Sequence, residues 1–262
     1  MKILILGAGN MTEAILEGLK NEADLSEFYI YSPSGISARE LAKKVGAKSV
    51  SSLDEVKDPA FVWIGCKPQQ LKDLAKNIAG KFSNATFVSM LAASSEADQL
   101  KLLQVKKLIR IMPNLSVRFK SGVTLVSSQT GAQEVNKIVA LFSLLGLALE
   151  VGEEELEELT LLTGSGPALF YEFTKYLTQS FSSLTENERE RLGRMVLTGA
   201  GDSVRMNYHP LSKLIDGVTS KAGVTIAVLE AWRQSSLQNE IKAGIDQGKL
   251  RSLQIKDSLR QS

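Results

Sequence analysis

Cysteine and histidine are almost missing from this sequence, whose 262 residues include one of each, Cys66 and His209. A single cysteine excludes an intrachain disulfide and suits a reducing compartment. Zinc sites and Ser-His or Cys-His hydrolases need several such side chains close together, so we expect no metal site and no such hydrolase. Because His209 precedes Pro210 between two helical patterns, we interpret it as a loop residue that caps a helix end.

Long apolar runs and an excess of one charge are missing too. The longest apolar stretches, such as Leu4 to Gly9 and Ala60 to Cys66, have the length of strands and fall far short of the ~20 residues of a membrane span. Thirty-one basic and 29 acidic residues give a net charge of +2, which argues against nucleic acid or a membrane as partner. The chain runs from Met1 into a strand without a charged leader, so a cytoplasmic location is expected.

Short β-rich runs alternate with helical patterns up to about residue 152. The runs are Ile3 to Leu6, Phe28 to Tyr31, Phe61 to Cys66, Thr86 to Leu91, Leu108 to Met112, Gly122 to Val126 and Leu147 to Val151. This alternation is typical of βαβ units, which build a mainly parallel sheet with helices on both faces. It predicts an α/β, doubly wound, Rossmann-like domain over residues 1–152.

From Glu153 onward the β-rich runs stop, and apolar residues recur at helical spacing, as at Leu156, Leu159 and Leu162. We therefore expect an all-α domain over residues 153–262 that adjoins the first without a linker and shares a long helix with it. Its segments Leu214 to Val218 and Val224 to Trp232 carry more apolar surface than this domain can bury. The surplus indicates a homodimer or higher homo-oligomer; packing of these side chains on their own first domain is the alternative.

A glycine-rich turn follows the first expected strand and reads Gly7-Ala8-Gly9-Asn10-Met11-Thr12. Gly7 permits a tight turn, and Gly9 lets the backbone approach a pyrophosphate, which then meets the free N–H groups of a helix from about Met11 to Leu19. Thr12 stands where a third glycine or alanine is usual. The context of strand, turn and helix favours a dinucleotide site over a plain turn.

The end of the second expected strand reads Tyr31-Ser32-Pro33-Ser34-Gly35 and offers no carboxylate for a ribose 2′-hydroxyl. Ser32, Ser34 and Arg39 suit a 2′-phosphate instead, so the sequence favours NADP(H) over NAD(H). For Ser34 an ordinary helix cap is an equally good interpretation.

The segment from Thr163 to Ala168 places Gly164, Gly166 and Pro167 inside a helical pattern. Helix interiors disfavour glycine by ~1 kcal/mol and proline by ~3 kcal/mol, so another backbone or a ligand is expected to come close here.

Five motifs occur in a fixed order along the chain. They are Gly7-Ala8-Gly9-Asn10-Met11, Lys67-Pro68-Gln69, Arg110-Ile111-Met112-Pro113-Asn114, Gly164-Ser165-Gly166-Pro167-Ala168 and, after His209-Pro210, Val218-Thr219-Ser220 with a threonine at the next helix entry. In this order and at these intervals the chain resembles the pyrroline-5-carboxylate reductases over essentially its whole length. The resemblance implies NADPH-dependent reduction of the cyclic imine 1-pyrroline-5-carboxylate to L-proline, the last step of proline biosynthesis.

The resemblance also implies a set of site residues. Those that line the NADPH are Gly7, Ala8, Gly9, Asn10, Met11, Ser32, Ser34, Ser52, Gly65, Cys66, Lys67, Pro68, Met90, Leu91, Ala92 and, near the nicotinamide, Asn114. Those assigned to substrate and catalysis are Ser220, Val224, Thr225 and Glu153. Plainer interpretations stand beside some of these: Cys66 as a buried small apolar group, Glu153 as an acid at a helix start and Ser220 as a helix cap.

The substrate loop departs from the family's usual VTSPGGTT, because Lys221 replaces a proline and Ala222 a glycine. The loop thereby loses rigidity and gains a cation. Two alternatives follow: an NADPH-dependent reductase of a related imino or oxo acid, and a nucleotide-binding paralogue without turnover.

Imine reduction itself needs no dedicated acid–base residue, since the protonated imine is already electrophilic and has mainly to be aligned with the nicotinamide.

Overall fold

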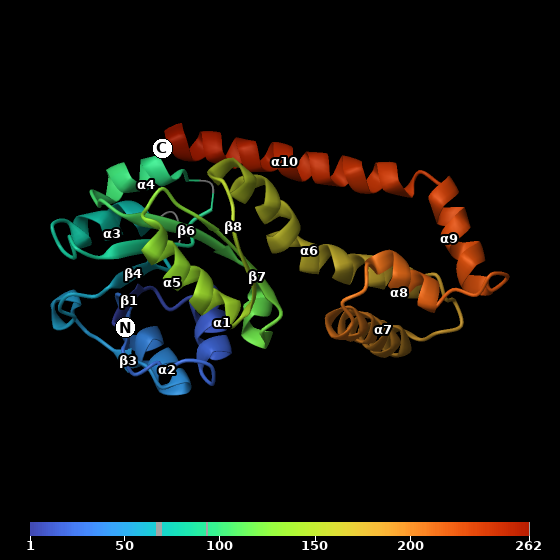
Figure 1. Ribbon diagram of the computed structural model, residues 1–262, viewed down its shortest axis with the longest axis horizontal. Coiled ribbons are helices and arrows are strands. Elements are labelled where there is room, and N and C mark those ends of the chain that lie inside the picture. Colours follow the sequence, from blue (N-terminus) through green and yellow to red (C-terminus); the bar gives the residue numbers. More distant parts are fainter. Residues whose placement is uncertain (67–69, 93, 262) are drawn as a thin grey trace. The chain divides into compact units, whose positions relative to one another are not determined.

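A computed structural model describes residues 1–66, 70–92 and 94–261, and the strands within its first 150 residues form one eight-stranded sheet (Figure 1). Its strands lie in the order β3-β2-β1-β4-β5-β6-β7-β8. Their bounds are β1 Ile3–Leu6, β2 Phe28–Tyr31, β3 Lys48–Ser49, β4 Phe61–Ile64, β5 Thr86–Ser89, β6 Leu108–Pro113, β7 Gly122–Ser127 and β8 Gly146–Glu150. All seven strands that the sequence predicted are confirmed within a few residues.

Two details of the sheet go beyond the expected mainly parallel arrangement. The pairing of β6 with β7 is antiparallel, while every other neighbouring pair is parallel. Residues 114–121 join these two strands through the short 3-10 helix η3 (Leu115–Phe119), and so short a link cannot return the chain for a parallel pairing. The sequence also missed β3, because its two residues, Lys48 and Ser49, are polar and exposed.

Helices cover both faces of this sheet. Those of the first 152 residues are α1 Asn10–Leu19, α2 Ile36–Val45, α3 Leu71–Ile78, α4 Glu96–Leu103, α5 Ala132–Ser143 and the 3-10 helix η1 Leu53–Glu55. Alternate residues of a strand point to opposite faces of the sheet. On one face Ile3 and Ile5 pack with α1, α2 and α5. On the other face Leu4 and Leu6 pack with η1, α3 and α4. Burial on both faces explains why these strands read as continuous apolar runs.

The remaining regular elements that the structure describes are helices. Their helices are α6 Glu153–Gln179, α7 Glu186–Met206, α8 Leu211–Gly217, α9 Val224–Gln234 and α10 Leu237–Gln261. The chain divides into two compact units: unit 1 comprises Met1–Gly164 and the chain from Arg251 onward, and unit 2 comprises Ser165–Leu250. The predicted boundary between residues 152 and 153 stays a prediction. No helix in the described parts of the chain is both long and apolar enough to span a membrane.

The helix α6 runs without a break through Gly164-Ser165-Gly166-Pro167. The sequence led us to expect another backbone or a ligand close to the glycines. A Cβ on Gly164 would meet, among the described residues, only Thr160 Cγ2 at 3.8 Å, so the expected close backbone is not found there.

Candidate functional site

The turn after β1 has the geometry that the glycine pattern predicted. Gly7 has φ +120°, and a Cβ on it would stand 2.6 Å from the carbonyl oxygen of Gly65. The helix α1 begins at Asn10 with Gly9 as its N-cap, and no described side chain caps it. Since the N–H groups of a first helical turn have no intrahelical acceptor, an anion in front of Gly9 and Asn10 meets free donors.

Thr12 occupies the place of the usual third glycine and is buried. A Cβ on Gly65 would stand 2.5 Å from Thr12 Oγ1, and this hydroxyl has no hydrogen-bond partner in the described part of the chain. The threonine therefore fills the space between α1 and β4, and position 65 has to be glycine as a result.

Gly7 and Gly65 flank the point where the order of the strands reverses. From β1 the chain goes first to β2 on one side and later to β4 on the other, and such a switch point opens a crevice at the carboxyl ends of the strands. Met90 follows β5 and reaches the same crevice, because its Cε lies 3.4 Å from where a Cβ on Gly65 would be. Cys66 is half-buried, and burial raises the pKa of its thiol, which favours the protonated thiol over the thiolate.

Other predicted cofactor residues follow these same strands. Ala8 and Met11 are half-buried on the α1 turn, and Leu91, buried, and Ala92, exposed, come after β5. The predicted Lys67 and Pro68 lie outside the described residues.

The turn after β2 holds its two predicted serines differently. Ser32 is buried, and its Oγ accepts hydrogen bonds from Ser37 Oγ (3.1 Å) and the backbone N–H of Ala38 (3.2 Å), which ties the turn to α2. Ser34 is exposed and does not cap α2, because the N-cap is Gly35 at φ +69°. The Arg39 guanidinium lies over this turn, 2.9 Å from where a Cβ on Gly35 would be.

Ser52, also expected at the cofactor, caps η1. Its Oγ accepts from the backbone N–H of Asp54 (3.2 Å), and Glu55 accepts in return from the Ser52 backbone N–H (2.7 Å). The Ser52 hydroxyl is therefore already hydrogen-bonded within this capping box.

The strand β6 holds α6 through one row of alternate residues. Arg110 is fully buried and donates from Nη1 to Glu153 (3.0 Å) and from Nη2 to Glu157 (2.6 Å). Met112 shares an apolar cluster with Leu156 of α6. These contacts give the RxMPN motif a structural role that sequence reasoning missed; an arginine in an apolar strand was one signal of it.

Two predicted site residues belong to this row of contacts. Glu153 Oε1 accepts from Arg110 and also from the backbone N–H of Glu96 (2.6 Å). Asn114 is buried; its Nδ2 donates to the carbonyl of Thr163 (2.8 Å), and its Oδ1 accepts from Val123 N–H (3.2 Å). Their predicted places beside substrate and nicotinamide stay predictions.

Glu96 is a further buried acid that the sequence did not single out. Its carboxylate accepts from the backbone N–H of Gln129 (3.1 and 3.2 Å). Burial, with a smaller contribution from the nearby Glu153 charge, raises the pKa of Glu96 above the usual glutamate range. Together with Arg110, Glu153 and Glu157 it forms a cluster of three acids around one base.

In unit 2, the predicted substrate residues lie together at the start of α9. Gly223 is the N-cap without a side-chain cap among the described residues, and its N–H donates to the carbonyl of Ser220 (3.1 Å). Ser220, Val224 and Thr225 lie around the unpaired N–H groups of this helix start. Gly223, and not Ser220, occupies the N-cap position of α9.

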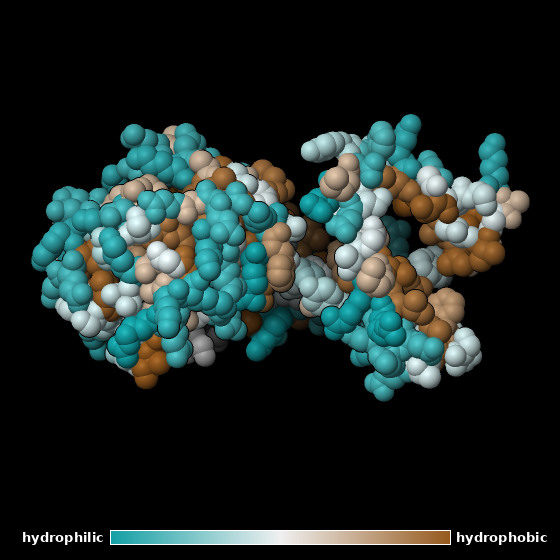
Figure 2. Space-filling model, turned by 90° about the horizontal axis from the view of Figure 1, so that it is seen from below, coloured by the Kyte–Doolittle hydropathy of each residue, from teal (hydrophilic) through white to brown (hydrophobic). Residues whose placement is uncertain are grey.

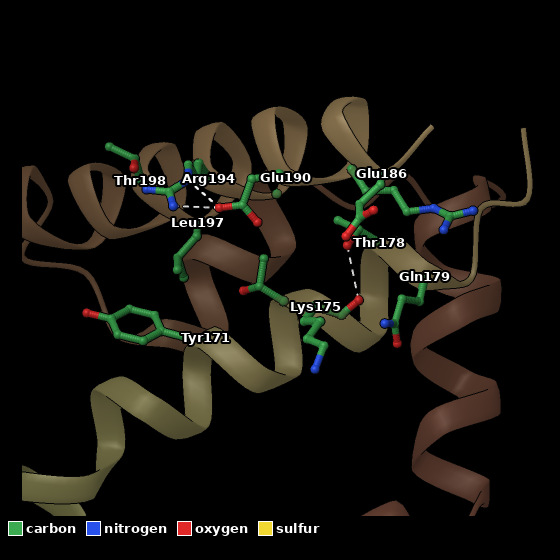
Figure 3. A pocket seen from close by; sticks show the side chains of 12 residues that line it. Tyr171, Lys175, Thr178, Gln179, Glu186, Glu190, Arg194, Leu197 and Thr198 are labelled. Carbon is green, nitrogen blue, oxygen red and sulfur yellow. Dashed lines mark hydrogen bonds and ion pairs between the residues drawn. The ribbon is translucent and has the colours of Figure 1, made fainter. Parts of the chain in front are cut away.

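Unit 2 also contains a groove of about 900 Å³ between the end of α6 and α7 (Figure 3). Tyr171 and Lys175 line it from α6, and Glu190 and Arg194 line it from α7. None of the predicted site residues that the structure describes lines this groove.

The helices around the groove expose many apolar side chains, which are brown in Figure 2. Exposed examples are Leu169, Phe170, Phe173, Leu192, Met195 and Val196. In the described part of α7 only Gly193 is buried, so this helix has hardly any core of its own within one chain.

Comparisons with known proteins agree over both halves of the chain. Residues 153–255 match the family described as "Pyrroline-5-carboxylate reductase dimerisation", and residues 2–93 match "NADP oxidoreductase coenzyme F420-dependent". The pyrroline-5-carboxylate reductase of Staphylococcus epidermidis is 32% identical over 245 residues, which cover 89% of this chain and 90% of the relative. That of Staphylococcus saprophyticus is 30% identical and covers 98% and 100%.

Solved structures have the same fold. A pyrroline-5-carboxylate reductase from Coxiella burnetii superposes with a TM-score of 0.84 at 20% identity over 98% of both chains. A Plasmodium falciparum pyrroline carboxylate reductase with NADP bound gives 0.77 at 19% identity over 99% of this chain and 98% of the other. With relatives at least 30% identical over nearly its whole length, this chain belongs to the pyrroline-5-carboxylate reductase family.

Proposed function

We propose that this protein reduces 1-pyrroline-5-carboxylate to L-proline with NADPH. The observation that carries the proposal is the agreement of two independent facts. Relatives that bear this activity in their names match the chain end to end, and the Gly7–Gly9 turn presents free N–H groups at the switch point of the sheet. The cofactor, when bound, supplies the hydride for the imine carbon.

The residues at the crevice fit a dinucleotide. Position 9 is open, because the nearest atom to a Cβ on Gly9 would be Gly65 O at 3.9 Å, so a pyrophosphate can approach the backbone there. We infer a preference for NADP(H) over NAD(H), since the turn after β2 carries Ser34 and no carboxylate, and Arg39 of α2 lies over it. Arg39 and the serines would hold the 2′-phosphate.

The substrate carboxylate is proposed to bind at the start of α9. The N–H groups of the first turn and the Thr225 and Ser220 hydroxyls supply donors, and Lys221 adds a positive charge to the same loop. The role of these residues is to orient the protonated imine, which is electrophilic without further activation. Val224, 83% exposed, would form an apolar wall for the ring.

A homodimer through the helical unit belongs to the same proposal. Unit 2 exposes apolar side chains along α6 and α7, and the groove between these helices lies open in the single chain. A second copy would bury both, as expected for an obligate interface. A cytoplasmic location remains a prediction from the sequence.

The proposal is tested by following NADPH absorbance with the purified protein and a panel of cyclic imino acids. We expect oxidation of NADPH with 1-pyrroline-5-carboxylate and slower oxidation of NADH. Turnover confined to a different imino or oxo acid would overturn the substrate assignment. If NADPH binds without turnover of any imine, the protein is a nucleotide-binding paralogue; recovery of activity in Lys221→Pro with Ala222→Gly would locate the cause in the substrate loop.

A further inference from the structure

The carbonyl of Thr163 lacks the hydrogen-bond donor that an α-helix normally provides. In an α-helix each carbonyl accepts the N–H of the residue four positions later, which for Thr163 is residue 167. That residue is Pro167, which has no N–H, yet α6 continues through it to Gln179. The helix therefore contains one carbonyl that its own backbone cannot satisfy in the usual way.

Asn114 supplies the missing donor from another element. Its Nδ2 lies 2.8 Å from Thr163 O, and the residue is 8% exposed. The orientation of the amide is fixed at both ends, because Oδ1 accepts from the N–H of Val123 at 3.2 Å while Asn114 N–H donates to the Val123 carbonyl at 3.1 Å. The side chain thus bridges β7 and the interrupted turn of α6.

This bridge lies where the chain passes from unit 1 to unit 2, between Gly164 and Ser165. Gly164, Gly166 and Pro167 make this stretch of α6 intrinsically weak. On the unit 1 side the helix is held by Arg110 through Glu153 and Glu157, and Asn114 holds it again just before the weak stretch.

We propose that Asn114 is a positioning residue. Its amide replaces the hydrogen bond that Pro167 removes from Thr163, and this fixes the point from which α6 continues into the helical unit. A loss of turnover is expected to follow when this part of α6 is loosened, and this last step rests on the proposed function.

A double-mutant cycle with Pro167→Ala tests the proposal, because an alanine at this position returns an N–H to Thr163 and makes the Asn114 donor redundant. Asn114→Asp keeps an oxygen acceptor for Val123 N–H and removes the donor to Thr163. Hydrogen exchange of peptides covering residues 158–170 is measured without cofactor. We expect Asn114→Asp to accelerate exchange about tenfold in the wild-type background and less than about twofold beside Pro167→Ala.

Asn136→Asp is the matched control, since it places the same charge on the exposed surface of α5 and should leave these peptides unchanged. Equal acceleration with and without Pro167→Ala would overturn the proposal. Should Asn114→Asp fail to fold, the double variant must recover soluble protein or a higher Tm. A double variant that is no more stable than the single one would refute the coupling.

A kinetic measurement separates positioning from direct contact with the cofactor. At saturating NADPH and imine, Asn114→Asp should lower kcat several-fold, and Pro167→Ala should restore most of it. A residue that acted only on the nicotinamide would show no such recovery. If the wild-type protein lacks turnover, the proposed function fails, while the exchange experiment still decides the role of Asn114.

Discussion

A Cβ on Gly7 would stand 2.6 Å from the carbonyl oxygen of Gly65, whereas a Cβ on Gly9 would have that same oxygen, at 3.9 Å, as its nearest neighbour. Gly7 also has φ +120°, in a region that favours glycine. The fold itself therefore requires glycine at position 7, whereas at position 9 glycine is expected only because of the proposed pyrophosphate.

This difference predicts opposite results for two alanine substitutions. Gly7→Ala should destabilise the cofactor-free protein by about 2 kcal/mol or more, because it adds backbone strain to a backbone clash. Gly9→Ala should leave stability within ~0.5 kcal/mol and weaken NADPH binding at least about tenfold, because its methyl group occupies the path of the pyrophosphate. Thermal unfolding without cofactor and fluorescence titration with NADPH measure the two effects.

Gly131→Ala is the control for both, since its φ is −58° and a Cβ there would have ordinary contact with Glu134 at 3.5 Å. Unchanged NADPH affinity in Gly9→Ala would show that the pyrophosphate does not bind at this turn.

The sequence predicted the central strands well because β1 and β4 are buried on both faces, so that Leu4 and Val62 lie in unbroken apolar runs. It could not reveal β3, whose residues Lys48 and Ser49 carry no apolar signal. The antiparallel pairing of β6 with β7 was recoverable from the short link between them. The hydrophobic periodicity that predicts strands does not show whether the link between two strands is long enough for parallel pairing.

For the site, the glycine turn was predictable because its backbone conformation, with φ +120° at Gly7 and Gly9 as the N-cap of α1, is set by neighbouring residues. The contacts of Arg110 and Asn114 were not, since they join residues about 40 to 50 positions apart. Only the alternation of the RxMPN motif hinted that Arg110, Met112 and Asn114 share one face of a strand. What that face touches is set by the path of α6.

The buried arginine gives a second prediction. Arg110 side-chain exposure is 1%, and its partners Glu153 and Glu157 are 34% and 23% exposed. Arg110→Met should lower the free energy of unfolding by about 3 kcal/mol, because it leaves the partly buried acids without their cation. Lys107→Met, which breaks the more exposed pair with Glu134, should cost less than ~1 kcal/mol. Urea denaturation compares the two variants. Equal losses in the free energy of unfolding would show that the buried pairs contribute no more to stability than the exposed pair.

The raised pKa of Glu96 gives a prediction about pH. A carboxyl whose pKa is higher in the folded state binds more protons there than in the unfolded state, so its contribution to stability is complete below the unfolded pKa and is lost as pH rises through the folded pKa. Glu96→Gln stays neutral and keeps an acceptor for Gln129. Its stability relative to wild type should therefore increase from about pH 4 toward neutral pH.

Glu55→Gln is the control of opposite sign. Hydrogen bonds from the Ser51 hydroxyl and the backbone N–H groups of Ser52 and Ser51 lower the pKa of Glu55, so its contribution is present above the unfolded pKa and is lost in acid. Relative to wild type, this variant should lose stability as pH rises over the same range. Urea denaturation at several pH values measures both differences, and the same slope for the two variants would contradict the assignment for Glu96.

The exposed apolar stripe of α7 gives the last prediction. Leu192, Met195 and Val196 stand at helical spacing i, i+3 and i+4 and are 50%, 69% and 59% exposed in the single chain. If a second copy covers them, Leu192→Lys buries an unpaired ammonium and should raise the dissociation constant of the dimer at least about 100-fold.

Leu144→Lys makes the same change at a 39% exposed leucine of unit 1 and should leave the dimer intact. Sedimentation velocity over a dilution series measures both constants. Dissociation of the Leu144 variant alone would place the dimer interface on the sheet unit instead, and the open groove between α6 and α7 would then need another explanation.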